Sequence, residues 1–149
     1  MSHYYVYTDG SSDLASETSG SSYYIQTDTH FINYGFQGLK TKYTLEAETS
    51  GLINAVNYLV NSVKPTKDDV IDVYVDTQIL KDYIDAYLKG DKNATCAAKN
   101  IRSLNKSLSQ LVPMVRIVNV YKVRAHTGVV NANMFVDALA KYGRYQIHR

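Results

Sequence analysis

Residues 70–78 read VIDVYVDTQ, a β-branched apolar run that stops at an acidic residue, Asp76. Such a run predicts a buried strand. Apolar residues then recur at helical spacing between Ile79 and Leu88, before Gly90, which predicts a helix directly after the strand. Strands that alternate with helices in this way are typical of α/β folds.

The chain before this unit predicts three strands. The segments 3–8, 23–27 and 30–36 are rich in tyrosine and β-branched residues, and Asp28-Thr29 fits a tight turn between the last two. We expect an antiparallel meander whose first strand stops at Asp9. The Ser-rich stretch 11–22 is expected to be a loop.

Helical periodicity marks the rest of the chain, apart from one further strand. A helix is expected from Thr44, its N-cap, to Lys64-Pro65, and close packing against a strand would compensate for Gly51, which costs about 1 kcal/mol relative to alanine. A helix over 97–111, a strand over 115–123, a loop over 124–131 and a helix over 134–142 follow. The expected fold is α/β, with a five-stranded mixed sheet (three antiparallel strands, then parallel ones) and helices on both faces.

Length and composition narrow the class of protein. The 149 residues fit a single domain spanning 1–149, and 45% hydrophobic with 20% charged residues is ordinary for a globular protein. The formal net charge of +2 neither demonstrates nor excludes a nucleic-acid partner. Cys96 is the single cysteine, so an internal disulfide and a cysteine-based zinc site are excluded. No membrane span or signal peptide is visible, and we expect a cytoplasmic protein without a membrane partner.

Four acidic residues fall at the ends of predicted elements. Asp9 and Asp76 follow strands, Glu48 lies early in a helix, and Asp137 lies early in the last helix, after a loop that carries His126. Acidic groups that converge in a fold repel one another unless a cation intervenes, and Mg²⁺ prefers such oxygen ligands. Each residue also has an ordinary structural interpretation: a turn residue, a helix cap, a partner of the helix dipole, or a solvated side chain.

Four blocks, in order, resemble ribonuclease H of the type 1 class over nearly the whole chain. They are Tyr7-Thr8-Asp9-Gly10-Ser11, the helix segment 48–56, Val75-Asp76-Thr77-Gln78, and the segment 123–128 continued by Asn133 and Asp137-Ala138-Leu139-Ala140. Only the choice of Glu48, and not the competing Glu46, aligns the helix segment with the family pattern.

The resemblance implies an endonuclease that cleaves the RNA strand of RNA–DNA hybrids with two Mg²⁺ ions, although Mn²⁺ also suits carboxylate ligands. It assigns metal binding and catalysis to four carboxylates, proton transfer and product release to a histidine, and substrate contacts to four further residues. The four carboxylates are those of Asp9, Glu48, Asp76 and Asp137, and the histidine is His126. The residues assigned to substrate contacts are Gly10, Ser11, Thr44 and Gln78. A monomer is the family expectation.

Two other functions remain open at this stage. A nuclease of the same fold could act on DNA, and a non-catalytic nucleic-acid-binding module could keep the fold without the reaction. The moderately basic region 89–106 corresponds to the handle with which some family members grip the duplex, but it is reduced, and a solvated helix face is the preferred interpretation of its lysines. Duplex affinity is therefore expected to be modest and salt-dependent.

Overall fold

Five strands form one mixed sheet in the order β3-β2-β1-β4-β5. The computed structural model describes residues 1–123 and 132–146. Strands β1, β2 and β3 are antiparallel, whereas β4 is parallel to both β1 and β5. The strands are β1 (His3–Asp13), β2 (Thr18–Gln26), β3 (Phe31–Leu39), β4 (Val70–Val75) and β5 (Ile117–Lys122). The predicted fold class is confirmed.

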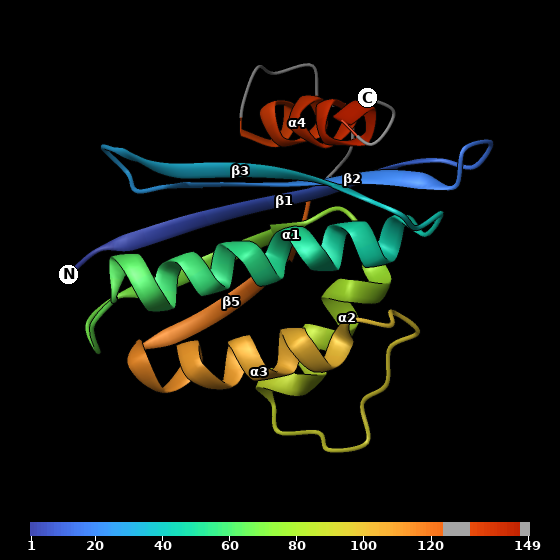
Figure 1. The fold of residues 1–149 in the computed structure, drawn as a ribbon. Helices are drawn as coiled ribbons and strands as arrows, with labels where there is room; N and C mark the ends of the chain where they lie inside the picture. Colours follow the sequence, from blue (N-terminus) through green and yellow to red (C-terminus); the bar gives the residue numbers. More distant parts are fainter. Residues whose placement is uncertain (124–131, 147–149) are drawn as a thin grey trace.

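Helices cover both faces of the sheet (Figure 1). They are α1 (Thr44–Tyr58), which continues as a π-helical turn (Leu59–Val63), α2 (Gln78–Leu88), α3 (Ile101–Leu111), which continues as a 3₁₀ turn (Val112–Met114), and α4 (Ala132–Gln146). Helix α4 lies alone on one face, and α1 lies on the other face with α3 beyond it. The core lies on the α1 side, where fully buried Val6, Leu52, Ile71 and Leu104 belong to one hydrophobic cluster.

The side chains of β1 alternate between the two faces, as expected for a strand. Val6 and Thr8 are fully buried, and Val6 belongs to the core. Tyr7 points to the opposite face, where its ring stacks on Tyr74 and meets Tyr24, which in turn contacts Phe135 of α4. The next residue of this parity, Asp9, therefore faces the same side as α4.

The prediction of a loop over 11–22 was wrong, as was the end of the first strand at Asp9. β1 continues to Asp13 and β2 already begins at Thr18, with Gly10 opposite Ser21 and Ser11 opposite Gly20. Tertiary packing outweighs the low strand propensity of serine and glycine. A Cβ on Gly20 would lie 1.7 Å from the carbonyl oxygen of Ala140, so the small residues let α4 rest directly on the backbone of β2.

The boundaries of three helices also differ from expectation. Tyr43, and not the expected Thr44, is the N-cap residue of α1, and the Thr44 hydroxyl donates to Ser12 Oγ (2.9 Å). α3 begins at Ile101 instead of 97, and α4 is longer at both ends than 134–142.

The expected close approach at Gly51 is confirmed. A Cβ at this position would lie 2.5 Å from the carbonyl oxygen of Ser22 on β2, so α1 packs directly on that strand.

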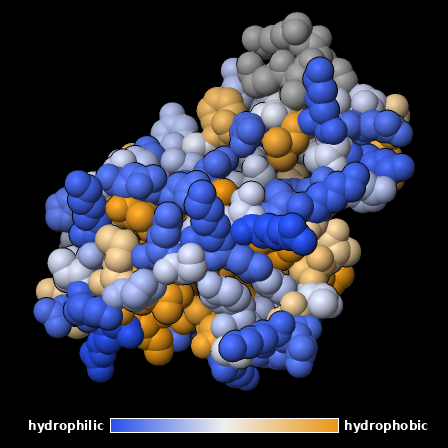
Figure 2. Space-filling view, turned by 60° about the horizontal axis from the view of Figure 1, so that its bottom comes forward, coloured by the Kyte–Doolittle hydropathy of each residue, from blue (hydrophilic) through white to orange (hydrophobic). Residues whose placement is uncertain are grey.

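The outer surface is polar with scattered apolar residues. On the face shown in Figure 2, hydrophobic patches are interrupted by hydrophilic side chains. Within the described part of the chain, no helix combines the length and the hydropathy that crossing a bilayer requires.

Candidate active site

The parallel pairing of β1 and β4 places two acidic residues next to each other. The ladder ends at Tyr7 opposite Tyr74, and Asp9 and Asp76 follow these partners by two residues each. Beyond this point β4 turns into α2, while β1 continues along β2. Ligands of open α/β sheets bind where strands end and diverge in this way.

Helix α1 supplies the third acidic residue. Glu48 is 1% exposed, and its carboxylate accepts hydrogen bonds from the backbone N–H of Asp76 (2.9 Å), the N–H of Thr77 (3.3 Å) and the Thr77 hydroxyl (3.0 Å). Gly10 allows the helix to approach, because a Cβ there would lie 2.7 Å from the backbone nitrogen of Glu48. Carboxylate oxygens of Asp9, Glu48 and Asp76 all lie within 4.8 Å of one another.

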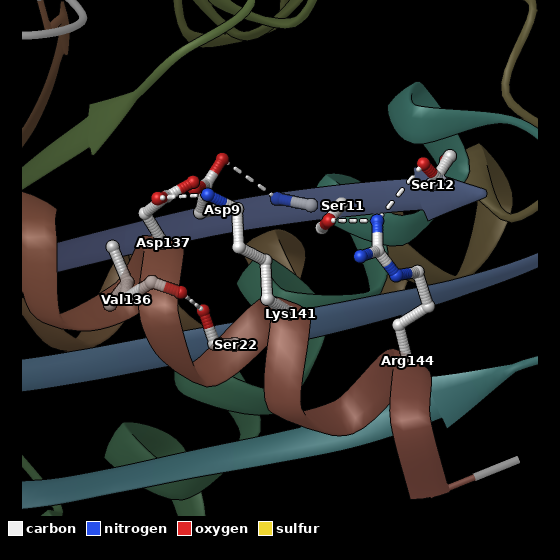
Figure 3. A network of polar contacts seen from close by, with 9 residues as sticks. Asp9, Ser11, Ser12, Ser22, Val136, Asp137, Lys141 and Arg144 are labelled. Carbon is white, nitrogen blue, oxygen red and sulfur yellow. Dashed lines mark hydrogen bonds and ion pairs between the residues drawn. The ribbon is translucent and has the colours of Figure 1, made fainter.

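Helix α4 brings a fourth carboxylate to Asp9. Figure 3 shows the side chains of Asp9 and Asp137 beside each other, and a hydrogen bond between them is one of the interactions that raise the pKa of Asp9. Lys141, one turn further along α4, has its Nζ 3.1 Å from Asp137 Oδ2. Asp9 also accepts a hydrogen bond from the N–H of Gly10 (2.9 Å).

The electrostatics of this cluster favour a bound cation. Burial, the hydrogen bond with Asp137 and the charge of Glu48 raise the pKa of Asp9 to about 8. Burial raises the pKa of Glu48 to about 7, although the N–H and hydroxyl donors of Asp76 and Thr77 act in the opposite direction. A divalent cation beside these groups would favour their ionised forms. The possible ligand atoms are all carboxylate oxygens, and this donor set fits a hard metal ion.

The other acidic residue at the start of α1 lies elsewhere. Glu46 accepts a hydrogen bond from the Thr41 hydroxyl (2.9 Å), and its backbone carbonyl accepts one from Asn100 (3.0 Å). Among the described residues, Glu48 and not Glu46 belongs to the acidic group around Asp9.

The predicted substrate-binding residues come from β1, α1 and α2, close in sequence to three of the carboxylates. Gly10 and Ser11 follow Asp9 on β1, and Thr44 bonds to that strand through Ser12. Gln78 is exposed at the start of α2, where its amide donates to Asp82 (2.7 Å). His126 lies outside the described residues.

Sequence reasoning missed three side chains that contact the site. Thr77 was quoted only as part of a motif, yet it donates to Glu48. Lys141 and Arg144 were not singled out, although they follow Asp137 at positions i+4 and i+7 and so share its face of α4. This spacing was a signal that could have found them.

The family model for RNase H matches residues 1–145. The chain belongs to the RNase H family. RNase H enzymes are metal-dependent nucleases, and the acidic triad of this chain is a possible metal-binding group.

Solved structures with the same fold include RNase H domains from several sources. The N-terminal RNase H domain of rv2228c from Mycobacterium tuberculosis has a TM-score of 0.75 and 17% identity, covering 99% of this chain and 97% of that one. RNase H1 from Halobacterium salinarum NRC-1 has a TM-score of 0.69 and 17% identity, and the match covers 97% of this chain and 98% of that one. LC11-RNase H1, solved in complex with an RNA/DNA hybrid, has a TM-score of 0.75 and 14% identity, covering 98% and 99%. No curated protein matches the sequence.

Proposed function

We propose that this chain hydrolyses the RNA strand of RNA–DNA hybrids with the help of two Mg²⁺ ions, leaving 5′-phosphate and 3′-hydroxyl ends. The observation that carries the proposal is the convergence of Asp9, Glu48 and Asp76 within 4.8 Å, with Asp137 against Asp9. Three carboxylates from β1, α1 and the end of β4 converge, and α4 adds a fourth beside the first of them. Burying acids against one another costs stability, and a metal site explains that cost.

The four carboxylates would hold the metal ions in this proposal. When bound, the ions lower the pKa of an attacking water and offset the charge that develops on the phosphate and on the leaving oxygen. Asp76 and Thr77 orient Glu48 through three hydrogen bonds, so its carboxylate is fixed before any ligand arrives. His126, whose ordinary pKa lies near neutrality, would transfer protons.

Substrate recognition would take place beside the metal ions. The residues that would contact the hybrid backbone are Gly10 and Ser11 on β1, Thr44 at the start of α1, and Gln78 at the start of α2. The 2′-hydroxyl distinguishes RNA from DNA, so these contacts would select the RNA strand. The binding of a hybrid by LC11-RNase H1, which shares this fold, supports this substrate class.

The test is a hybrid-cleavage assay with Mg²⁺ on the wild type, Asp9→Asn, Glu48→Gln and the matched control Glu46→Gln. Removal of a group that stabilises the transition state costs on the order of 10²–10³ in rate, and we expect at least this loss for Asp9→Asn and Glu48→Gln. Glu46→Gln should cleave like the wild type. Full activity of Asp9→Asn, or a greater loss for Glu46→Gln than for Glu48→Gln, would contradict the assignment.

The same experiment separates the other two functions. Preferential cleavage of duplex DNA would indicate a DNA nuclease of the same fold. A non-catalytic binding module would cleave neither substrate and would give no heat on calorimetric titration with Mg²⁺.

A further inference from the structure

A cationic side chain of α4 lies against the strand that follows Asp9. Arg144 Nη1 is 3.0 Å from Ser11 Oγ and 3.2 Å from the carbonyl oxygen of Ser12, so one nitrogen of the guanidinium donates to two consecutive residues (Figure 3). From the other side, the Thr44 hydroxyl of α1 donates to Ser12 Oγ. Ser11 and Ser12 are thus held between the end of α4 and the start of α1.

This part of β1 is paired with a neighbouring strand on one side only. Pairing with β4 stops at Tyr7, whereas pairing with β2 continues as far as Asp13. The segment from Gly10 to Ser12 therefore has one edge that no strand of the described ladder covers, and it begins one residue after Asp9. Backbone N–H and C=O groups that point to such an edge have no strand partner there and can hydrogen-bond a ligand.

The hydrogen bond from Arg144 also sets the direction in which Ser11 can donate. The Ser11 oxygen accepts from the guanidinium, so its hydroxyl proton is left for a different acceptor. A positive donor on that oxygen also polarises the hydroxyl and strengthens the bond that it donates. A ribose 2′-hydroxyl is an acceptor that a deoxyribose lacks.

We propose that Arg144 is a positioning residue for recognition of the RNA strand: it holds the Ser11 hydroxyl and the Ser12 backbone so that the edge of β1 contacts a ribose 2′-hydroxyl. The proposal rests on hybrid recognition within the proposed function but does not require cleavage. It makes the end of α4 part of substrate selection, seven residues beyond the carboxylate of Asp137.

A merely structural role for Arg144 would be to fasten α4 to the sheet. That role would lower stability and weaken the binding of every nucleic acid alike. The positioning role affects the preference for RNA, so the preference itself is the decisive measurement.

The experiment measures the affinity of fluorescently labelled RNA–DNA hybrid and of DNA duplex of the same sequence by anisotropy, in metal-free buffer at one fixed salt concentration. The variants are Arg144→Met, Arg144→Lys, Ser11→Ala and the double variant Ser11→Ala/Arg144→Met. Arg116→Met is the matched control, since Arg116 is an exposed arginine just before β5. Thermal unfolding of each variant shows that it is folded.

We expect the wild type to prefer the hybrid, and Arg144→Met to lose about three- to tenfold of that preference, as for one lost hydrogen bond. Ser11→Ala should lose the same amount, and the double variant no more than either single variant. Arg144→Lys keeps the charge but lacks the planar fork, so it should restore duplex affinity without restoring the full preference.

Three results would overturn the proposal: a wild type that binds both duplexes equally, an Arg144→Met variant with unchanged preference, or losses that add in the double variant. If Arg144→Met does not fold, Ser11→Ala and Arg144→Lys decide alone, and unchanged preference in both refutes the proposal. Preference without any cleavage by the wild type would refute the proposed function and leave this inference standing.

Discussion

Two buried carboxylates at opposite ends of the parallel strand pair have different surroundings. Asp69, just before β4, and Asp9, on β1, are 5% and 6% exposed. Asp69 accepts hydrogen bonds from the N–H of Ser2 (2.8 Å) and of Thr66 (2.7 Å), whereas Asp9 faces Glu48 and Asp137. The two carboxylates are therefore equally buried, but Asp69 is surrounded by hydrogen-bond donors and Asp9 by other acidic groups.

The pKa values follow from this difference. Burial alone would raise the pKa of Asp69, but the donors from Thr66 and Ser2 outweigh it and hold that pKa below its ordinary value. For Asp9, burial, Asp137 and Glu48 act together and raise the pKa to about 8. A buried acid with its own donors stabilises the fold, whereas a buried acid among acids is suited to bind a cation.

The largest expected effect is an opposite response of the two positions to the same substitution. Asp69→Asn leaves buried N–H donors poorly satisfied and should lower the free energy of unfolding by about 1–3 kcal/mol. Asp9→Asn removes repulsion and should raise the stability of the metal-free protein at alkaline pH. Denaturant unfolding in the presence of a chelator measures both. Destabilisation by Asp9→Asn that matches Asp69→Asn would refute the comparison.

A smaller effect is expected at the donor that orients Glu48. Thr77→Val removes the hydroxyl that donates to Glu48 Oε2, and loss of such a second contact to a metal ligand typically costs about 10–100-fold in metal affinity or activity. The hybrid-cleavage rate at limiting Mg²⁺ measures it.

Thr49→Val is the matched control for this prediction. The Thr49 hydroxyl donates to the Leu45 carbonyl within α1 and does not contact the carboxylates, so the cleavage rate should be unchanged. Equal losses in both variants would remove the special role of Thr77.

The smallest effect concerns pH. In the unfolded chain Asp9 and Glu48 lose their protons near their ordinary pKa values of 3.8 and 4.5, but in the folded metal-free protein they keep them to about 8 and 7. Between these limits the unfolded state binds fewer protons, so stability falls as the pH rises. The melting temperature should drop by about 3 °C or more between pH 5 and pH 8.

Asp9→Asn should flatten this dependence, and Mg²⁺ should stabilise the wild type more at pH 8 than at pH 6, because it binds the ionised carboxylates. A melting temperature that rises with pH in chelator would contradict the prediction.

Periodicity was sufficient for most of the fold because apolar spacing directly reports which face of an element is buried. The strand 70–75 and the helix that carries Leu80 and Ile84 were predicted within a few residues. The extension of β1 and β2 through serine and glycine could not be predicted this way, since those residues become a strand through the helices packed on them.

The positions of the acids along the chain were visible in the sequence, but their mutual distances were not. The family pattern separated Glu48 from Glu46, and the fold places Glu48 next to Asp9 and Asp76. Thr77 and Arg144 make contacts between elements far apart in sequence, so residue type and local spacing alone do not reveal their partners.

The contact at Gly20 has a consequence for how the two halves of the molecule are held. An extra methyl group there would meet both the Ala140 carbonyl oxygen and, at 2.5 Å, the backbone nitrogen of Arg144. One hydrogen atom in place of a side chain thus sets the thickness of the layer between β2 and α4. A residue with no functional group fixes how far the carboxylate of the last helix stands from its counterpart on the central strand.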